Sequence, residues 1–130
     1  MRVLESKTPI LILSYLNCEL YCCHLDGYKA NTAALYKRLD EIESILTTKP
    51  SHSKFRIWFN LDDNILTRST MKLIAESVRH FEIHIYKIVF IGLHGFTRWK
   101  FDYILNQTIG KKTITKAYFS DAELAKGWLL

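Results

Sequence analysis

Strand-length apolar runs alternate with segments of helical period along this chain, and that alternation restricts the fold more than any other feature. Two runs, 9–16 and 19–25, come first and are expected to form a hairpin. Later runs occupy 55–61 and 86–91, and a last strand is expected at 113–118. Helical spacing of apolar residues fills the intervals between the later runs. The pattern predicts an α/β domain whose sheet is largely parallel or mixed.

The helices are predicted from apolar residues that recur three and four positions apart. They are Leu35, Leu39, Ile42 and Leu46 in the first helix, and Met71, Ile74, Val78 and Phe81 in the second. Asn31 is suited to cap the first helix, which should stop before Pro50. A third helix is expected over 96–108, with Gly110 at its exit.

A fourth helix has the clearest start signal in the sequence. Ser120 and Glu123 form a capping-box pattern, and Phe119 with Leu124 forms the matching hydrophobic staple. We therefore expect the helix to begin at Ser120. Its core face should consist of Leu124, Trp128 and Leu129.

Length and composition indicate one globular domain. No motif in the sequence indicates a cofactor. The chain has 130 residues, a net charge of +5 and a sequence pI near 9.1. This basic balance permits an acidic partner, a membrane surface or nucleic acid without requiring any of them. The apolar run 10–16 is too short to span a bilayer, and no signal peptide is expected. Three cysteines, two of them adjacent, indicate reduced thiols and a cytoplasmic protein.

The stretch IVFIGLHGF, residues 88–96, raises the question of a phosphate-binding loop. Its two glycines, Gly92 and Gly95, stand three apart with bulky residues between them. Neither G-x-G-x-x-G nor G-x-x-x-x-G-K-[ST] is present in the sequence. The preferred interpretation is that Gly92 ends a strand and Gly95 opens a helix. The alternative is an anion held at the helix N-terminus, near Arg98 and Lys100.

The order of features in the second half of the chain resembles a known family. They are a glycine-flanked turn after an apolar strand, then Asn106, the exit Gly110-Lys111-Lys112 and the ending Ala125-Lys126-Gly127-Trp128-Leu129. Together they resemble the SpoIIAA-like branch of the STAS superfamily, and residues 24–28 fit more loosely. The resemblance implies a single STAS-like domain: a mixed sheet of four or five strands with about four helices packed on it.

The resemblance also carries an expected function. Most members of this branch have no known activity, and better-known relatives are anti-sigma-factor antagonists switched by phosphorylation of a serine that opens the second helix. Ser69 stands at the matching place, but Arg68 replaces the acidic neighbour, which departs from the kinase-recognition pattern. The branch is also similar to CRAL-TRIO lipid-transfer domains, so a carrier of lipid or of a hydrophobic small molecule is the alternative function.

Three constellations were weighed as chemical sites, and each has a structural interpretation that we prefer. Cys22, Cys23 and His24 are adjacent, but two ligands on one strand face do not make a zinc site. His80 and His84 are four apart, although the helix should end between them. Asp62 and Asp63 follow a strand, where catalytic carboxylates occur but solvated turn residues occur too. We therefore expect no metal, no cofactor and no catalysis.

The segment 98–116 is basic and contains interleaved aromatic residues. Phe96, Trp99 and Tyr103 share one side of a helix, with Lys100 beside them. This mixture could bind nucleic acid or anionic lipid head groups. The preferred interpretation is that the aromatic side chains are core and the lysines a solvated rim.

The sequence thus predicts a non-catalytic cytoplasmic module that binds a partner protein. The candidate surface runs along the second helix and onto the third: Arg68, Ser69, Lys72, Arg79, Arg98, Trp99 and Lys100. A basic rim beside apolar residues suits an acidic protein or an anionic, lipid-like ligand. Nucleic acid is not the expected partner, and a homodimer is left open.

Overall fold

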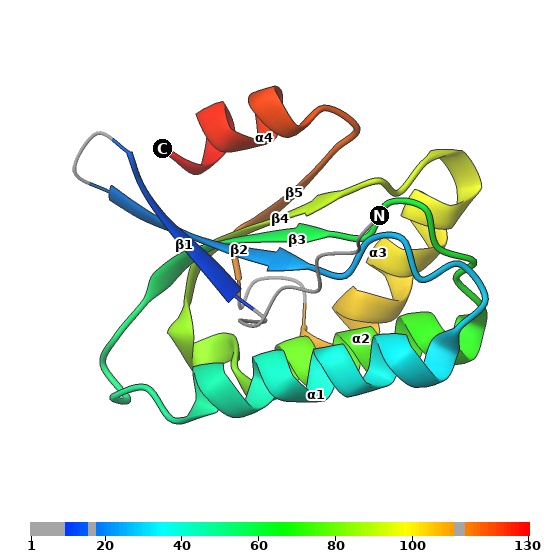
Figure 1. The fold of residues 1–130 in the computed structure, drawn as a ribbon, viewed down its shortest axis with the longest axis horizontal. Helices are drawn as coiled ribbons and strands as arrows, with labels where there is room; N and C mark the ends of the chain where they lie inside the picture. Colours follow the sequence, from blue (N-terminus) through cyan, green and yellow to red (C-terminus); the bar gives the residue numbers. More distant parts are fainter. Residues whose placement is uncertain (1–9, 16–17, 111–113) are drawn as a thin grey trace, which may run out of the picture.

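The computed structural model describes residues 10–15, 18–110 and 114–130, which form five strands and four α-helices (Figure 1). The strands are β1 (Ile10–Tyr15), β2 (Cys18–His24), β3 (Phe55–Asn60), β4 (Ile85–Ile91) and β5 (Lys116–Phe119). The helices are α1 (Thr32–Thr47), α2 (Arg68–His80), α3 (Gly95–Ile109) and α4 (Ala122–Leu129), with a short 3-10 turn, η1 (Glu82–His84), before β4. The predicted alternation of strands and helices is confirmed in its predicted order.

The strands lie in the sheet in the same order as in the chain, β1-β2-β3-β4-β5. β1 and β2 are antiparallel, as a hairpin requires, whereas β2 to β5 run parallel to one another. The sheet is therefore mixed and five-stranded, which agrees with the expected α/β class.

Strand order also determines where the helices lie. Crossovers between parallel strands are right-handed, so an order that always advances in one direction places every crossover helix on the same face. Figure 1 shows α1, α2 and α3 together below the sheet, and α4 alone above it. The molecule thus has a thick helical layer on one face and a single short helix on the other.

The larger core, between the sheet and α1 to α3, contains a chain of aromatic contacts. The Phe59 ring lies 6.0 Å from the ring of Phe81 and 5.9 Å from that of Phe90, and Phe90 lies 5.0 Å from Phe101 of α3. The predicted apolar faces of the first two helices are confirmed, because all eight residues are buried: Leu35, Leu39, Ile42, Leu46, Met71, Ile74, Val78 and Phe81. Asn31 caps α1 as predicted, accepting a hydrogen bond from the Ala34 N–H at 3.2 Å.

A smaller core lies under α4 on the opposite face. Its buried members are Leu20, Cys22, Trp58, Val89 and Ile91 from the strands, and Ala125 and Leu129 from the helix. Two basic side chains of the sheet hold the end of the helix. Arg56 donates to the Leu129 carbonyl at 2.6 Å, and Lys87 donates to the Trp128 carbonyl at 3.1 Å. Cations are favourable at a helix C-terminus because its last carbonyls have no partner within the helix.

The start of α4 differs from the prediction. The helix begins at Ala122, and its cap is Asp121, whose carboxylate accepts from the Glu123 N–H at 2.9 Å. Ser120 therefore precedes the cap. Aspartate and serine cap about equally well. Leu124 is 62% exposed, because it lies about 140° round the helix from the buried Leu129, and Phe119 packs against the half-buried Trp128.

Several predicted features fall partly outside the described residues. These are the turn at Asn17, the lysines of the exit Gly110-Lys111-Lys112, and Thr113 at the start of the predicted last strand. Within the described part, β5 covers Lys116–Phe119 rather than 113–118. Gly110 ends α3 as predicted, with a φ of +87° that favours glycine.

Candidate functional site

The outer surface of α3 carries a row of exposed aromatic side chains. Phe96, Trp99 and Tyr103 are 71%, 63% and 53% exposed. Their rings stack in sequence, with centroids 5.5 Å apart for Phe96 and Trp99 and 6.2 Å apart for Trp99 and Tyr103. The preferred interpretation of these three residues as core was therefore wrong, whereas the exposure of Trp99 agrees with its place on the candidate surface.

A second apolar stripe on α3 takes the core position instead. It consists of Phe101, Ile104, Leu105 and Ile109, all of which are buried. Phe101 packs edge-on against Phe90 of β4 and lies 6.3 Å from Tyr118 of β5. Because α3 has apolar residues on two sides, only one of them can face the sheet. The other remains in water as the aromatic row.

Two charged residues of α3, Asp102 and Arg98, lie on the flank that faces β5. Asp102 accepts a hydrogen bond from the Tyr118 hydroxyl at 2.6 Å and lies 3.5 Å from the Lys116 ammonium group. Burial, with the Asp102 carboxylate beside it, raises the pKa of Tyr118 well above its ordinary value. Arg98 lies over the Tyr118 ring at 5.4 Å, also on the β5 side. The Asp102 carboxylate thus makes its contacts with residues of β5.

On α2, the predicted surface residues are exposed but not all are near one another. Arg68, Ser69 and Lys72 lie in the first turns of the helix, which Thr67 caps by accepting from the Thr70 N–H at 3.2 Å. Arg79 lies near the opposite end, where it forms an ion pair with Glu76 at 2.9 Å. Eleven residues of helix separate Arg79 from Arg68, a rise of about 16 Å. Arg79 therefore belongs to a different part of the surface.

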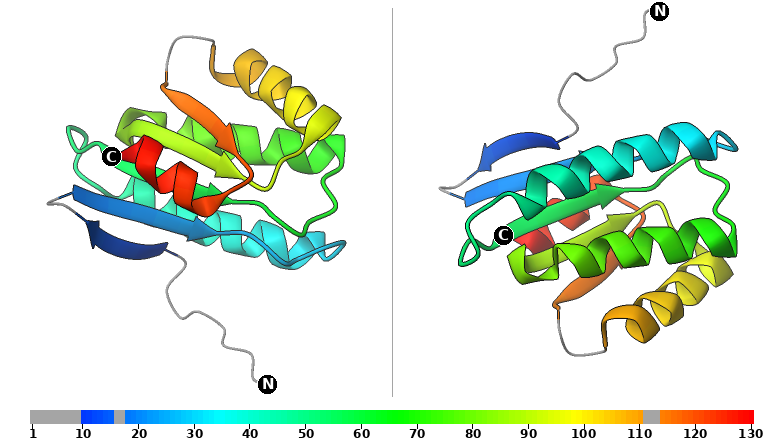
Figure 2. Two further views of the ribbon diagram at one scale, coloured as in Figure 1. Left: turned by 90° about the horizontal axis from the view of Figure 1, so that it is seen from above. Right: turned by 90° about the horizontal axis from the view of Figure 1, so that it is seen from below.

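The remaining predicted residues are brought to one side of the molecule by the fold. α2 and α3 each follow a parallel strand, so both begin near the C-terminal ends of the strands. Figure 2 shows the two helices side by side. The first three turns of the two helices carry what we call the α2–α3 face: Arg68, Ser69, Lys72, Phe96, Trp99, Lys100 and Tyr103. Arg98 lies on the flank of α3 that faces β5. Phe96 and Tyr103 had been assigned to the core by sequence reasoning.

Gly92 ends β4 for a packing reason. Its φ is +93°, and a Cβ at this position would lie 2.5 Å from the Cα of Asp62 in the loop after β3. Only glycine allows this approach of two backbones. Gly95, with φ +53°, is the first residue of α3, as predicted.

The loops after β2 and β3 are joined by Asn64. Its amide group donates to the Leu25 carbonyl at 2.7 Å and to the Leu61 carbonyl at 3.0 Å, and its side-chain oxygen accepts from the Tyr28 N–H at 3.0 Å. Backbone bonds continue the pairing, from the Lys29 N–H to Asp63 and from the Ile65 N–H to Lys29. The loops at the C-terminal ends of β2 and β3 are therefore joined to each other just before α2 starts.

The carboxylates in these loops after β2 and β3 make local contacts. Asp62 accepts from the Asp63 N–H at 3.0 Å, and Asp63 is exposed with a φ of +58°. Asp26 pairs with His24 at 3.3 Å, and the hydrogen bond from His24 lowers the pKa of Asp26. These are the contacts of polar turns. They activate no nucleophile.

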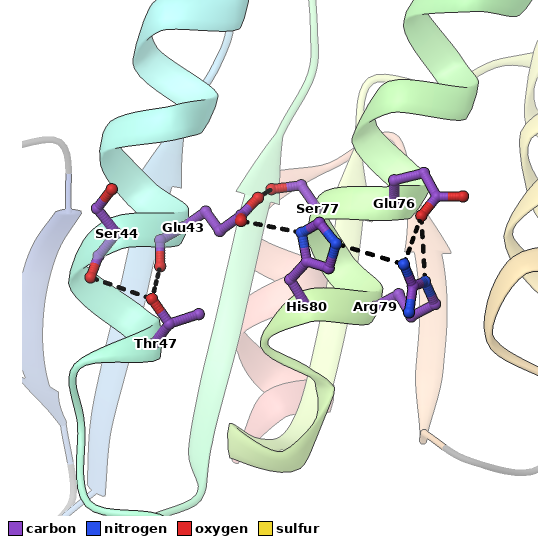
Figure 3. A network of polar contacts seen from close by, with 7 residues as sticks. All are labelled: Glu43, Ser44, Thr47, Glu76, Ser77, Arg79 and His80. Carbon is purple, nitrogen blue, oxygen red and sulfur yellow. Dashed lines mark hydrogen bonds and ion pairs between the residues drawn. The ribbon is translucent and has the colours of Figure 1, made fainter.

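A groove of about 310 Å³ between α1 and α2 contains a polar network that sequence reasoning missed (Figure 3). Ser77 donates to Glu43 at 2.7 Å, and His80 Nδ1 lies 2.9 Å from the other oxygen of Glu43. Arg79 approaches His80 Nε2 at 3.3 Å. Since arginine only donates, Nε2 accepts there and Nδ1 carries the proton toward Glu43.

This network has the residue types of a hydrolytic triad in a different connectivity. A triad needs the serine hydroxyl on the imidazole, which removes its proton. Here Ser77 donates to the carboxylate, so the imidazole does not activate it. The network joins α1 to α2, and no sequence spacing could have shown it, because its members are 34 and 37 residues apart.

The two adjacent cysteines and His84 lie in packed positions. Cys22 and Cys23 are buried and unpaired, as predicted, while the side chain of Cys18 falls outside the described part. His84 is buried and its Nδ1 lies 3.0 Å from the Ser53 carbonyl oxygen. α2 ends at His80, so His80 and His84 do not share a helix. Among the described residues, no three His, Cys, Asp or Glu side chains could hold a metal ion together.

A pocket of about 400 Å³ lies between the β1–β2 hairpin and α4. Apolar residues and the open side of Gly127 form most of its lining, with one acidic and one basic side chain at the rim: Leu13, Ser14, Leu20, Glu123, Lys126, Gly127 and Leu130. It has the size of a small-molecule site.

In the part of the chain that the structure describes, no helix is both long and apolar enough to cross a bilayer. Comparison of the chain with family models, curated proteins and solved structures found no match.

Proposed function

We propose that this chain is a non-catalytic binding or regulatory module of the STAS, anti-sigma-factor-antagonist-like type, and that it binds an acidic protein partner through the α2–α3 face. The observation that carries the proposal is the row of exposed, stacked rings of Phe96, Trp99 and Tyr103. Aromatic residues are enriched at protein interfaces, where they supply much of the binding free energy. Their mutual stacking holds them ordered before a partner arrives, which lowers the entropy cost of binding.

The charges beside the row favour an acidic partner. Arg68 and Lys72 are exposed in the first turns of α2, and Lys100 stands beside the row on α3. The acidic group of α3, Asp102, is bonded to Tyr118 and Lys116 on the opposite flank. A partner that approaches the rings therefore meets positive charge, which raises its association rate and favours acidic surfaces.

Two features support the STAS-type part of the proposal. The mixed five-stranded sheet with four helices agrees with the arrangement that the sequence resemblance implies. Ser69 is exposed in the first turn of α2, at the edge of the binding face. A phosphate group there would add negative charge beside Arg68 and Lys72 and would weaken an acidic partner's binding.

The test is capture of a partner from an extract of the native host, followed by binding measurements on the purified pair. Trp99→Ser should abolish capture or weaken it by at least about tenfold, since central aromatic residues commonly contribute 2 kcal/mol or more. Ile83→Ser is the matched control, because Ile83 is 54% exposed and lies outside the face. Arg68→Glu with Lys72→Glu should weaken binding most at low salt, where screening is least.

The proposal fails if Trp99→Ser captures the same partner as strongly as the wild type does. It also fails if Ile83→Ser loses binding to the same extent, since a general loss of surface apolar groups would then explain both results. Thermal unfolding of each variant shows whether a lost interaction reflects a lost fold.

The pocket beside α4 favours a second candidate function, the binding of a hydrophobic small molecule. Its leucine side chains would hold an apolar body, and Lys126 at its rim would pair with an acidic head group. Native mass spectrometry of protein purified from its host tests this directly. A retained ligand should disappear in Gly127→Leu, because space is open beside Gly127 and the new side chain would fill the pocket. Retention of the ligand in that variant would exclude this pocket.

A further inference from the structure

The two edges of the sheet are protected to very different degrees. β5 is four residues long and begins with Lys116, whose ammonium group pairs with Asp102. β1, at the other edge, has six residues, Ile-Leu-Ile-Leu-Ser-Tyr, with no charge, proline or glycine. Short strands, lysines and prolines are the usual means by which proteins keep an edge from pairing with another chain. β5 uses two of these means, and β1 uses none.

β1 has backbone hydrogen-bonding groups on its outer side that face no strand among the described residues. It pairs with β2 on one side, in register from Ile10 with Cys23 to Tyr15 with Cys18. No other strand among the described residues pairs with it, and Figure 2 shows it along the outer margin of the sheet. Alternate residues of such a strand direct their N–H and C=O groups outward. These groups form a template for one more strand.

Two neighbouring apolar side chains of β1 are exposed, one on each face of the sheet. Leu11 is 50% exposed and Ile12 is 47% exposed, and successive strand residues point to opposite faces. Ile10 is buried in the helix-side core, and Leu13 packs against the core under α4. An added strand would be suited to this edge if it, too, were uncharged and apolar on both faces.

We propose that the added strand is β1 of a second copy of this chain, paired antiparallel across a twofold axis into one continuous sheet. β1 itself has the properties just described. A twofold contact uses the same surface on both copies, so an uncharged strand meets an uncharged strand. β1 and the adjacent β2 contain one Asp, Glu, Lys or Arg residue between them, Glu19, so little charge repulsion opposes this contact although the whole chain has a net charge of +5.

The contact leaves the α2–α3 face free, because α2 and α3 belong to the crossovers on the far side of β3. This inference does not depend on the proposed function. Six strand residues span about 20 Å, and a strand edge covers less than the roughly 800 Å² per partner of a standard interface. We therefore expect a reversible dimer whose fraction increases with protein concentration.

Sedimentation equilibrium of the full chain over a wide concentration range tests the proposal. The wild type should shift from the 15.3 kDa monomer toward twice that mass as concentration rises. Ile12→Lys should remain monomeric, because it places like charges at the shared edge. Ile83→Lys makes the same change at a site of similar exposure outside the sheet edge and should dimerise like the wild type. Ser14→Lys, which replaces an exposed polar residue, gives the same test if Ile12→Lys does not fold.

A wild type that stays monomeric at every concentration would overturn the proposal. So would a dimer that persists in both Ile12→Lys and Ser14→Lys, since the contact would then lie elsewhere. Open-ended assembly beyond the dimer would exclude the twofold arrangement. Amide hydrogen exchange gives a second readout: protection of alternate residues in β1 should rise with concentration in the wild type and not in Ile12→Lys.

Discussion

Arg56 donates from Nε to the backbone carbonyl of Leu129 at 2.6 Å, which fixes the last turn of α4 to the third strand of the sheet. Lys87 of the neighbouring strand donates to the Trp128 carbonyl and lies 5.1 Å from the centre of the Trp128 ring. These contacts explain how a helix of eight residues remains docked on a small core.

Arg56→Ala should loosen α4 and lower the free energy of unfolding by about 1.5–3 kcal/mol, the range for hydrogen bonds made by charged groups. Relative to the wild type, amide hydrogen exchange in this variant should increase more in α4 than in α1. Lys37→Ala on the exposed side of α1 is the control for loss of one positive charge. Equal effects of the two substitutions would mean that net charge, not the contact, is responsible.

Asn64→Asp should destabilise the protein by about 2–3 kcal/mol, although the two side chains have nearly the same shape. The aspartate retains the acceptor for the Tyr28 N–H but directs an oxygen at the Leu25 and Leu61 carbonyls, which lose their donor. Chemical denaturation measures the change. Gln107→Glu makes the same change of charge on the exposed surface of α3 and should be nearly neutral.

Gly92→Ala and Gly127→Ala should have effects of opposite sign. The new methyl group at position 92 would meet the Asp62 backbone at 2.5 Å, and the positive φ adds strain, so we expect a loss of several kcal/mol. Gly127 lies within α4 with open space around it, where alanine stabilises a helix by about 0.5–1 kcal/mol. Thermal unfolding temperatures would show both effects, and a tolerated Gly92→Ala would contradict the described approach of the two loops.

Stability should fall at alkaline pH because of the buried thiols. Burial raises the pKa of Cys22 to about 11, partly offset by the nearby positive charge of Lys126, and burial raises the pKa of Cys23 as well. The unfolded chain releases these protons near the ordinary value of 9.0. Between those values the folded state binds more protons, so the free energy of unfolding decreases as pH rises, by up to about 1.4 kcal/mol per pH unit for each thiol.

Urea unfolding at a series of pH values would test this expectation. Cys22→Ala should reduce the alkaline slope, while the difference between variant and wild type should be constant below the ordinary thiol pKa. If the free energies of unfolding of Cys22→Ala and wild type differ by a constant amount at every pH, the Cys22 thiol has the same pKa in the folded and unfolded states.

The packing of a helix could be predicted from the sequence where that helix has only one apolar face to turn toward the sheet. α1 and α2 each have a single apolar stripe, and the residues expected in the core are buried. α3 could not be resolved in this way, because Trp99 and Phe101 lie on different sides of the same helix and periodicity does not say which side meets the sheet. The choice depends on the fit of Phe101 between Phe90 and Tyr118, which is a tertiary contact.

The candidate site was predicted only in part for the same reason. Arg68, Lys72 and Lys100 were assigned to the surface because charged residues outside an apolar stripe face solvent. The aromatic row beside them was assigned to the core, since large rings are usually buried. The bond between Ser77 and Glu43 depends on how α1 and α2 are set against each other, which no local pattern specifies.

Because the strands are arranged in chain order, each new strand can join the edge of what has already formed. Each parallel pair joins strands that are neighbours in the chain, as Leu20 with Arg56 and Ile88 with Lys116, so no pair of strands depends on a segment far along the sequence. The chain can therefore assemble progressively as it leaves the ribosome. The exception is the face under α4, because Trp58, Val89 and Ile91 are covered only after α4 has been synthesised. Until then the nascent chain exposes an apolar sheet surface, and this is the stage at which a chaperone would be needed most.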